Sequence, residues 1–226
     1  MKTLFIVIST AIITLFASMQ AHAALENLGA DSLGNNLIYD SDLDITWYDF
    51  SNSADLWQEQ MNWADTLDVD FGGAHFTEWR LPSTVDGSYS FKSDGTSSTG
   101  FNITNSEMGH LYYTELGNLG GEDTSGNGQS VSGLVNTGDF QNLQISAYWA
   151  GTKSAINTNN SWYFHTINGS QGPGNMLLGN YAAIAVSDGR ISLETSAAVA
   201  PEPLSTTLFA IGAFAMGFRM YRRQKL

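Results

Sequence analysis

The sequence predicts an α+β domain with two helices and several short antiparallel strands. Two segments, 54–67 and 107–116, place apolar residues at the spacing of a helix with one buried face. Three later segments are short apolar or aromatic runs between loops rich in Gly, Asn and Ser, which is typical of strands. Because helical and strand-like segments occupy separate parts of the chain, the pattern favours α+β over alternating α/β architecture.

The chain begins with a segment typical of a secretory signal peptide. Lys2 precedes an apolar stretch over residues 4–16, and Ala21-His22-Ala23 is a small-x-small cleavage site. An uncleaved anchor is the alternative, but the stretch is short and the cleavage site favours removal. We therefore expect residues 1–23 to be removed after Ala23 and the rest of the chain to be exported.

The domain is expected to extend over residues 24–194 and to start with a β-hairpin. Residues 36–40 and 45–48 alternate or run apolar on either side of the turn-like stretch 40–44. Asp and Ser dominate this stretch, and such residues favour turns by accepting backbone hydrogen bonds. The sequence therefore predicts two antiparallel strands joined at this turn.

Two helices are expected next, each with a capping signal. The first extends over residues 54–67 with Ser53 as its N-cap, and the second over residues 107–116 with Ser106 as its N-cap. Gly117 is the expected stop of the second helix. The apolar residues expected to be buried are Trp57, Met61 and Ala64 in the first helix and Met108, Leu111, Tyr112 and Leu116 in the second.

The rest of the domain is predicted to form short strands and long polar loops. Residues 147–149, 161–165 and 181–186 are β-branched or aromatic runs of strand length. The intervals 86–100 and 119–138 are polar and rich in Gly and Ser, so we expect loops there.

The domain is strongly acidic and the chain has no cysteine. Between residues 24 and 200 there are four of the nine cationic and 21 of the 22 acidic residues, a formal charge of −17. This charge argues against binding to nucleic acid or to an anionic surface. The absence of cysteine excludes thiol catalysis, disulfide exchange and thiolate metal sites.

The C-terminal part predicts a membrane anchor behind a short linker, residues 195–200. Pro201, Glu202 and Pro203 precede an apolar run over residues 204–218, which is long enough for a short transmembrane helix. By the positive-inside rule, the cations after it should stay in the cytoplasm with the domain on the outer side. These membrane-orienting cations are Arg219, Arg222, Arg223 and Lys225.

Residues 201–226 resemble the PEP-CTERM sorting signal of Gram-negative bacteria, since Pro-Glu-Pro is followed by an apolar helix and a basic tail. The resemblance implies processing by an exosortase at or near Pro201, Glu202 and Pro203 in an organism that secretes exopolysaccharide. A glycosylphosphatidylinositol tail, the remote alternative, lacks a cationic end. The protein would be anchored in the inner membrane until cleavage and would then reach the cell surface or the extracellular space.

Residues 35–190 contain an ordered series of short motifs. They are Asn62-Trp-Ala-Asp65, Gly72-Gly73, Trp79-Arg80-Leu81-Pro82, Glu107-Met-Gly-His-Leu-Tyr-Tyr113, Leu116-Gly-Asn118, Asn136-Thr-Gly138, Tyr148-Trp149 and Trp162-Tyr-Phe164. This series resembles the Lcl-like domain family. That family is assigned a C-type-lectin-like fold and has no settled function, so the resemblance implies a fold without an activity. One departure is residues 185–188, where relatives tend to carry an arginine and this chain has Ala-Val-Ser-Asp.

The sequence offers one structural motif and several weak metal sites. Arg80, in the Trp79-Arg80-Leu81-Pro82 turn, could face a ligand, but the simpler interpretation is that it pairs with an acid. Oxygen-rich turns suit calcium, yet the same residues are common in ordinary turns. The calcium candidates are Asp40, Asp42 and Asp44 in one turn and Glu122 and Asp123 in another. Glu107 and His110, at i and i+3 on a helix, could also share a metal.

Motifs for known activities of the implied fold are absent. Formylglycine-generating oxidases need cysteines, and calcium-dependent lectins need Glu-Pro-Asn or Gln-Pro-Asp loops; the sequence has neither. The sequence also contains no serine-hydrolase elbow, phosphate loop or zinc-protease motif. Aromatic rings for stacking on sugars remain, namely Tyr148, Trp149, Trp162 and Tyr163, although about half of such strand residues should be core.

These observations favour an exported, non-enzymatic surface or extracellular-matrix protein that associates with exopolysaccharide or other surface components. Its expected partners are an exosortase, exopolysaccharide and the inner membrane before processing, with no nucleic acid. No cofactor is identified, and calcium is the open candidate. One alternative is an enzyme that uses paired carboxylates on periplasmic or matrix glycans. The other is a calcium-stabilised structural spacer.

Overall fold

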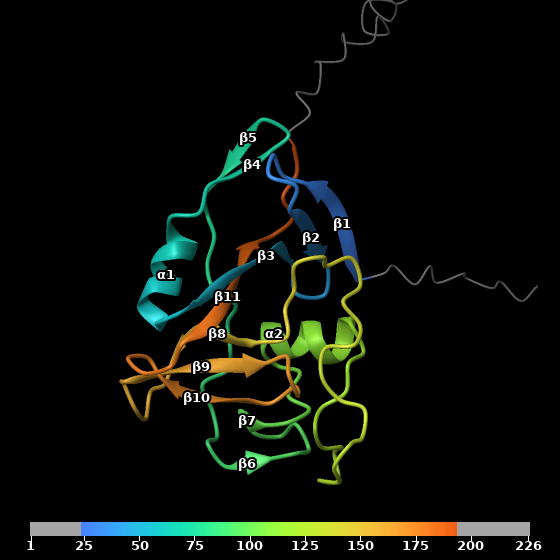
Figure 1. The fold of residues 1–226 in the computed structure, drawn as a ribbon, viewed down its shortest axis with the longest axis vertical. Coiled ribbons are helices and arrows are strands. Elements are labelled where there is room, and N and C mark those ends of the chain that lie inside the picture. Colours follow the sequence, from blue (N-terminus) through green and yellow to red (C-terminus); the bar gives the residue numbers. More distant parts are fainter. Residues whose placement is uncertain (1–23, 194–226) are drawn as a thin grey trace, which may run out of the picture. The chain divides into compact units, whose positions relative to one another are not determined.

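The computed structural model describes residues 24–193, whose regular secondary structure is mainly β-strand (Figure 1). All of their helices and strands belong to one compact unit that ends at Ile191. The strands are β1 (Leu25–Ala30), β2 (Asn36–Asp40), β3 (Ile45–Asp55), β4 (Val69–Phe71), β5 (Ala74–Phe76), β6 (Phe91–Lys92), β7 (Thr99–Gly100), β8 (Ala147–Lys153), β9 (Asn160–His165), β10 (Gln171–Asn175) and β11 (Tyr181–Asp188). The helices are α1 (Trp57–Asp65), α2 (Glu107–Gly109) and the π-helical η1 (His110–Glu115).

Nine of these strands form a single mixed sheet, and β4 and β5 form a separate hairpin. The order in the large sheet is β1-β2-β3-β11-β8-β9-β10-β7-β6. Neighbouring strands are antiparallel except for β11 with β8 and β6 with β7. The last strand of residues 24–193, β11, thus lies in the middle of the sheet, between β3 and β8, and joins the N-terminal strands to the later ones.

The predicted α+β, C-type-lectin-like fold is wrong, because the described residues form mainly this nine-stranded sheet and only two short helical segments. Short antiparallel strands with two helices were expected, whereas β3 alone has 11 residues. The apolar spacing near residue 54 predicted a helix, but the segment is a strand. Asn52 and Asp55 pair with β11, and this pairing within the sheet decides the conformation.

The first helix is accordingly shorter than predicted. It starts at Trp57 rather than at residue 54, and its N-cap is Leu56, whose side chain makes no capping bond. Ser53, the expected cap, lies within β3. Trp57 and Ala64 are buried as predicted from their spacing, and Met61 packs partly buried beside them.

The second helix occupies its predicted place but is mostly π-helical. Its start is confirmed, because the Ser106 hydroxyl accepts a bond from the Gly109 nitrogen at 3.0 Å. Its stop is confirmed too, since Gly117 adopts a φ of 62°, a left-handed conformation that glycine adopts without strain. Between Ser106 and Gly117 the helical turn is wider than that of an α-helix. The Leu116 nitrogen donates to the Leu111 carbonyl, five residues earlier, at 2.9 Å, which is the hydrogen bond of a π-helix.

The centre of the sheet is buried on both faces, which explains the continuous apolar run in β11. Ala182, Ile184 and Val186 face a core that includes Leu111 and Tyr112 of η1. Residues that alternate with them face the opposite side, where Ala183 packs with Trp57 and Ala64 of α1, and Ala185 packs with Tyr48 and Trp79. The helices therefore cover opposite faces of the central strands.

The hairpin predicted around residues 40–44 is confirmed, with Asp40 opposite Ile45 in the register of β2 and β3. The three later strands are confirmed as β8, β9 and β11. The signal peptide, the linker and the transmembrane helix predicted over residues 204–218 lie outside the described residues. Between residues 24 and 193, no helix is both long and apolar enough to cross a membrane.

Candidate functional site

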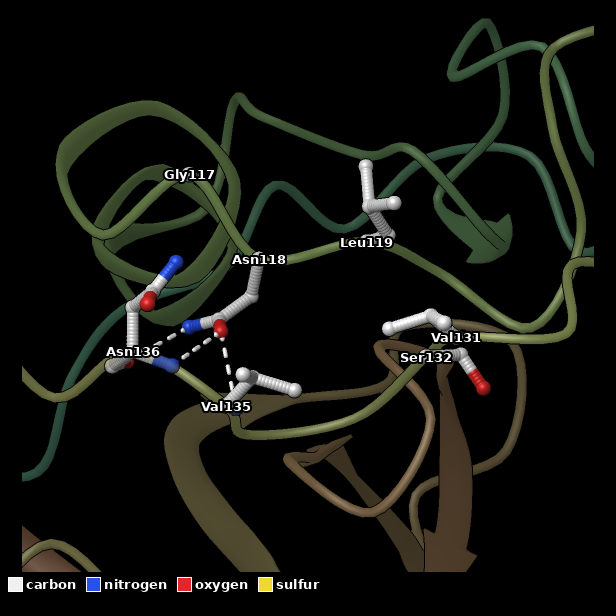
Figure 2. Close-up of a pocket in the computed structure, with 7 residues that line it drawn as sticks. All are labelled: Gly117, Asn118, Leu119, Val131, Ser132, Val135 and Asn136. Carbon is white, nitrogen blue, oxygen red and sulfur yellow. Dashed lines mark hydrogen bonds between the residues drawn. The ribbon is translucent and has the colours of Figure 1, made fainter.

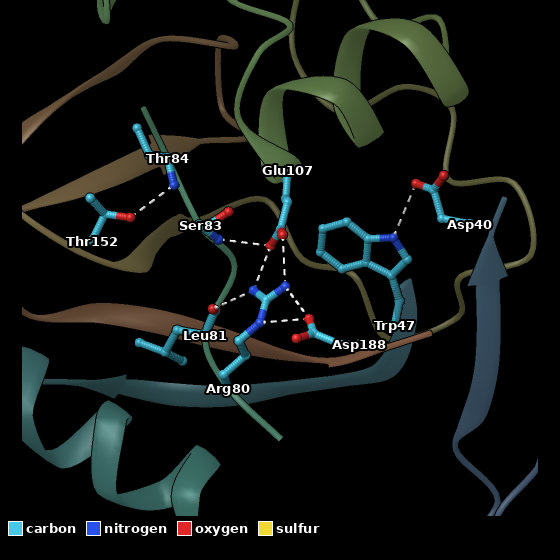
Figure 3. Close-up of polar contacts among 9 residues, drawn as sticks. All are labelled: Asp40, Trp47, Arg80, Leu81, Ser83, Thr84, Glu107, Thr152 and Asp188. Carbon is cyan, nitrogen blue, oxygen red and sulfur yellow. Dashed lines mark hydrogen bonds and ion pairs between the residues drawn. The ribbon is translucent and has the colours of Figure 1, made fainter. Parts of the chain in front are cut away.

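Arg80 is at the centre of a network of ion pairs that ties the Trp79-Arg80-Leu81-Pro82 turn to α2 and β11 (Figure 3). Its two terminal nitrogens each donate to a different oxygen of Glu107 at 2.8 Å, a bidentate geometry. Asp188 accepts from Nε at 3.0 Å and from Nη2 at 2.6 Å. The pKa of the Arg80 guanidinium is raised, first by its bonds to Glu107. These contacts favour the structural interpretation of Arg80.

The other residues of the turn are also committed to the fold. Trp79 and Leu81 are buried, and the Pro82 carbonyl accepts from the Gly151 nitrogen at 2.9 Å. Main-chain bonds between Arg80 and Val186 join the turn to β11. Asp188 is the last residue of the stretch 185–188, in which relatives of the Lcl-like family were expected to carry an arginine. In this chain Asp188 instead pairs with Arg80 and so fixes the end of β11.

The first calcium candidates, Asp40, Asp42 and Asp44, do not share their partners. Asp40 is fully buried, and its Oδ1 accepts from the nitrogens of Asp42 and Leu43, both at 3.1 Å. Asp44 accepts instead from the Tyr39 hydroxyl at 2.9 Å. Asp40 and Asp44 thus fix the turn through different donors, as acidic turn residues often do.

The second pair of calcium candidates is held by the loop that contains it. The Asp123 carboxylate accepts from the nitrogens of Ser125 and Asn127, both at 2.9 Å, and from the Asn127 side chain. These bonds lower the pKa of Asp123. Glu122 accepts a short bond from the Ser93 hydroxyl. The two carboxylates are therefore used to shape loops that lie side by side.

The structure brings Asp40 together with His110 and Glu115, although the sequence suggested Glu107 as the partner of His110. The ligating atoms of these three side chains all lie within 4.8 Å of one another. Glu107 is instead bound to Arg80. Sequence reasoning missed Glu115 because residues five apart lie on different sides of an α-helix, and the sequence carries no recognised sign of the π-turn.

Most of the rings considered for sugar stacking are in the core. Tyr148, Trp149 and Trp162 are fully buried, and Tyr163 is partly buried against Tyr181. The polar atoms of the three buried rings bond within the domain; the Trp162 indole, for example, donates to Asp86 at 3.0 Å. These side chains stabilise the sheet and present no open platform for a sugar ring.

Phe91 is the large aromatic side chain with the greatest exposure among residues 24–193, at 58%. Its ring packs edge-on against Phe101 at a centroid distance of 5.7 Å, which holds it in place. Beside it is an open groove of about 390 Å³, lined by side chains that are mostly polar and small. The lining residues are Phe91, Lys92, Ser93, Asp94, Thr124, Ser125 and Gly126.

A second, smaller pocket of about 130 Å³ lies where the loop after η1 folds back on itself (Figure 2). Asn118 closes one side, because its amide bonds the main chain at Val135 and Asn136 over distances of 2.8 to 2.9 Å. Leu119 and Val131 line it and are themselves half-exposed or more. Its small volume and apolar lining make it a poorer site for a sugar than the groove at Phe91.

Comparisons of the chain with models of protein families, with curated proteins and with solved structures give no match.

Proposed function

We propose that the protein is exported, is processed at its C-terminal sorting signal and acts without catalysis as a surface or matrix component that binds exopolysaccharide. Export rests on the signal peptide and on the terminal segment from Pro201 to Lys225. The observation that supports polysaccharide binding is the groove beside Phe91, whose ring is exposed and fixed by Phe101.

The groove combines the two kinds of contact that a sugar chain needs. An aromatic face covers the apolar side of a pyranose ring, and hydroxyl and charged groups bond its hydroxyls. Here Phe91 supplies the ring, Thr124 supplies a hydroxyl, and Lys92 and Asp94 supply charges of opposite sign. Because the domain carries a formal charge of −17, a neutral polysaccharide suits it better than a strongly anionic one.

The groove also bears on the enzymatic alternative. Glycoside hydrolysis by carboxylates uses two acids about 5–10 Å apart on either side of the scissile bond. Within residues 24–193, Asp94 is the acid that lines the groove, and the nearby Glu122 carboxylate accepts a hydrogen bond from the Ser93 hydroxyl. We therefore propose a binding role on the basis of the exposed ring and the polar lining, and the assay for reducing ends distinguishes it from hydrolysis.

The experiment is to measure retention of a 24–200 fragment, which contains all the helices and strands from β1 to β11, on exopolysaccharide from a producing strain. Phe91→Ala should weaken retention about five- to thirtyfold, since stacking on one ring contributes about 1–2 kcal/mol. Leu178→Ala is the matched control, because Leu178 is an apolar side chain at 82% exposure outside the groove. Equal retention of the two variants would show that the groove at Phe91 does not bind the polysaccharide.

A further inference from the structure

Asp40, His110 and Glu115 come from two segments that are about 70 residues apart in sequence. Asp40 is the last residue of β2, and the other two begin and end η1. His110 Nε2 lies 3.0 Å from Glu115 Oε1 and 4.0 Å from Asp42 Oδ2. An imidazole and three carboxylates therefore meet where the β2–β3 turn contacts the π-helix.

The π-helix creates this arrangement. In an α-helix, residues five apart are rotated by about 140° around the axis and cannot face one ligand. In η1 the hydrogen bond from residue 116 to residue 111 widens the turn, and His110 and Glu115 come into contact. Such π-turns are rare and are frequently found at functional sites.

The carboxylates of this cluster are poorly neutralised. Asp40 is fully buried, and the Glu115 side chain is only 7% exposed. Asp40 Oδ2 has a long contact of 3.4 Å from the Trp47 indole, and within residues 24–193 no hydrogen bond reaches Glu115 Oε2. Burial raises the pKa of both acids, and for Glu115 the neighbouring Asp40 raises it further.

We propose that Asp40, His110 and Glu115 bind a divalent transition-metal ion, with Zn²⁺ as the best match. Zinc accepts imidazole nitrogen and carboxylate oxygen at about 2.0–2.2 Å in a tetrahedron, so its ligand atoms lie about 3.4 Å apart. Shifts of about 1 Å in these side chains reach that geometry from the observed separations of up to 4.8 Å. Calcium requires six to eight oxygen ligands and does not favour imidazole.

Asp42 completes the site from the solvent side. Its side chain is 56% exposed, and its Oδ2 is 4.0 Å from His110 Nε2, so it is placed to give the fourth ligand. The bound ion would take the place of the hydrogen bond between His110 Nε2 and Glu115 Oε1, and the proton of that bond would be released to solvent. It would also connect the β2–β3 turn to η1, and so stabilise the fold independently of polysaccharide binding.

The test is calorimetric titration of the 24–200 fragment with Zn²⁺, and with Ca²⁺ in a parallel arm. We expect one Zn²⁺ per chain, a higher Tm when it is bound, and at least tenfold weaker binding in His110→Gln and in Glu115→Gln. His75→Gln is the control, because His75 with Asp68 forms an exposed pair elsewhere that could hold zinc nonspecifically. Binding that is absent in the wild type, stronger for Ca²⁺, or lost in His75→Gln but kept in His110→Gln overturns the proposal.

A second measurement uses the wild-type fragment and so does not depend on folding of the variants. The imidazole NMR signals of His75, His110 and His165 are followed during the Zn²⁺ titration. The His110 signal should shift at one equivalent while that of His165, which packs between Tyr163 and Tyr181, stays in place. An unmoved His110 signal at saturating Zn²⁺ contradicts the site.

Discussion

Arg80 shows how a single cation can organise an acidic domain. Its guanidinium group bonds two acids from different elements, Glu107 at the start of α2 and Asp188 at the end of β11. The Glu107 side chain is only 13% exposed, so it needs a partner that stays charged and has fixed geometry. Asp188 is 80% exposed and adds less, because solvent screens that pair.

Arg80→Lys should lower the free energy of unfolding by about 1–3 kcal/mol, because lysine keeps the charge but cannot make the bidentate contact. Arg80→Ala should cost more, since it leaves Glu107 without a counter-charge. Urea unfolding of the 24–200 fragment measures both changes.

The control is Arg190→Lys, which alters a similar bidentate pair with Glu26 on the open surface. That change should be much smaller, because exposed pairs contribute little. A loss in Arg80→Lys no larger than that in Arg190→Lys would show that the network around Arg80 does not stabilise the fold.

At the scale of elements, the packing of β9 against β11 introduces a pH-sensitive group. His165 of β9 lies 4.8 Å from the Tyr163 ring and 6.1 Å from the Tyr181 ring, measured between centroids. Burial lowers the pKa of this imidazole below its usual 6.5. The folded state therefore binds the proton less tightly than the unfolded state.

The stability provided by neutral His165 is consequently complete above pH 6.5 and should fall as the pH drops through the lower folded pKa. His165→Gln should reduce the loss of stability between pH 7.5 and pH 5, as followed by urea unfolding at each pH. His75→Gln should not reduce it, because the pKa of His75 is raised by Asp68 and its effect has the opposite sign. Parallel pH curves for wild type and His165→Gln would contradict this role.

Elements were predictable where local signals acted alone. The β2–β3 hairpin, the Ser106 cap and the Gly117 stop follow from side-chain chemistry within a few residues, and all three are confirmed. The start of α1 was not predictable, because residues 52–55 are held in β3 by a strand 130 residues later. The short strand β7 likewise depends on pairing with Gln171 of β10, about 70 residues later, and β6 joins the sheet only through β7.

The same distinction holds for the candidate site. The sequence singled out Asp40 for its place in a turn and His110 for its helical spacing from Glu107. The contact of Asp40 with His110 depends on tertiary packing. The contact of His110 with Glu115 depends on the π-turn. The groove at Phe91 was missed because it joins two loops, 91–94 and 124–126, that are far apart in sequence. Loops of this kind carry no periodic signal.

At the scale of the whole molecule, the charge distribution agrees with the proposed topology. The domain is acidic, and four of the five cations outside it follow the apolar run of residues 204–218. The positive-inside rule favours cations next to a membrane span on the cytoplasmic side, which is where the proposed topology puts these four.

Removing residues 201–226 should abolish retention in the inner membrane and exosortase processing, so that the product appears in the periplasm. Fractionation with immunoblotting checks this outcome. Replacing Pro201, Glu202 and Pro203 by alanine should keep the anchor and block cleavage, which separates anchoring from processing. Unchanged localisation and mass in the truncated protein would contradict the sorting role.

Polysaccharide binding is tested by retention of the wild-type 24–200 fragment on exopolysaccharide, with calcium and with chelator, while reducing ends are followed. We expect saturable retention in both conditions and no new reducing ends, as for a binding module. New reducing ends, or a complete lack of retention, would contradict the proposal.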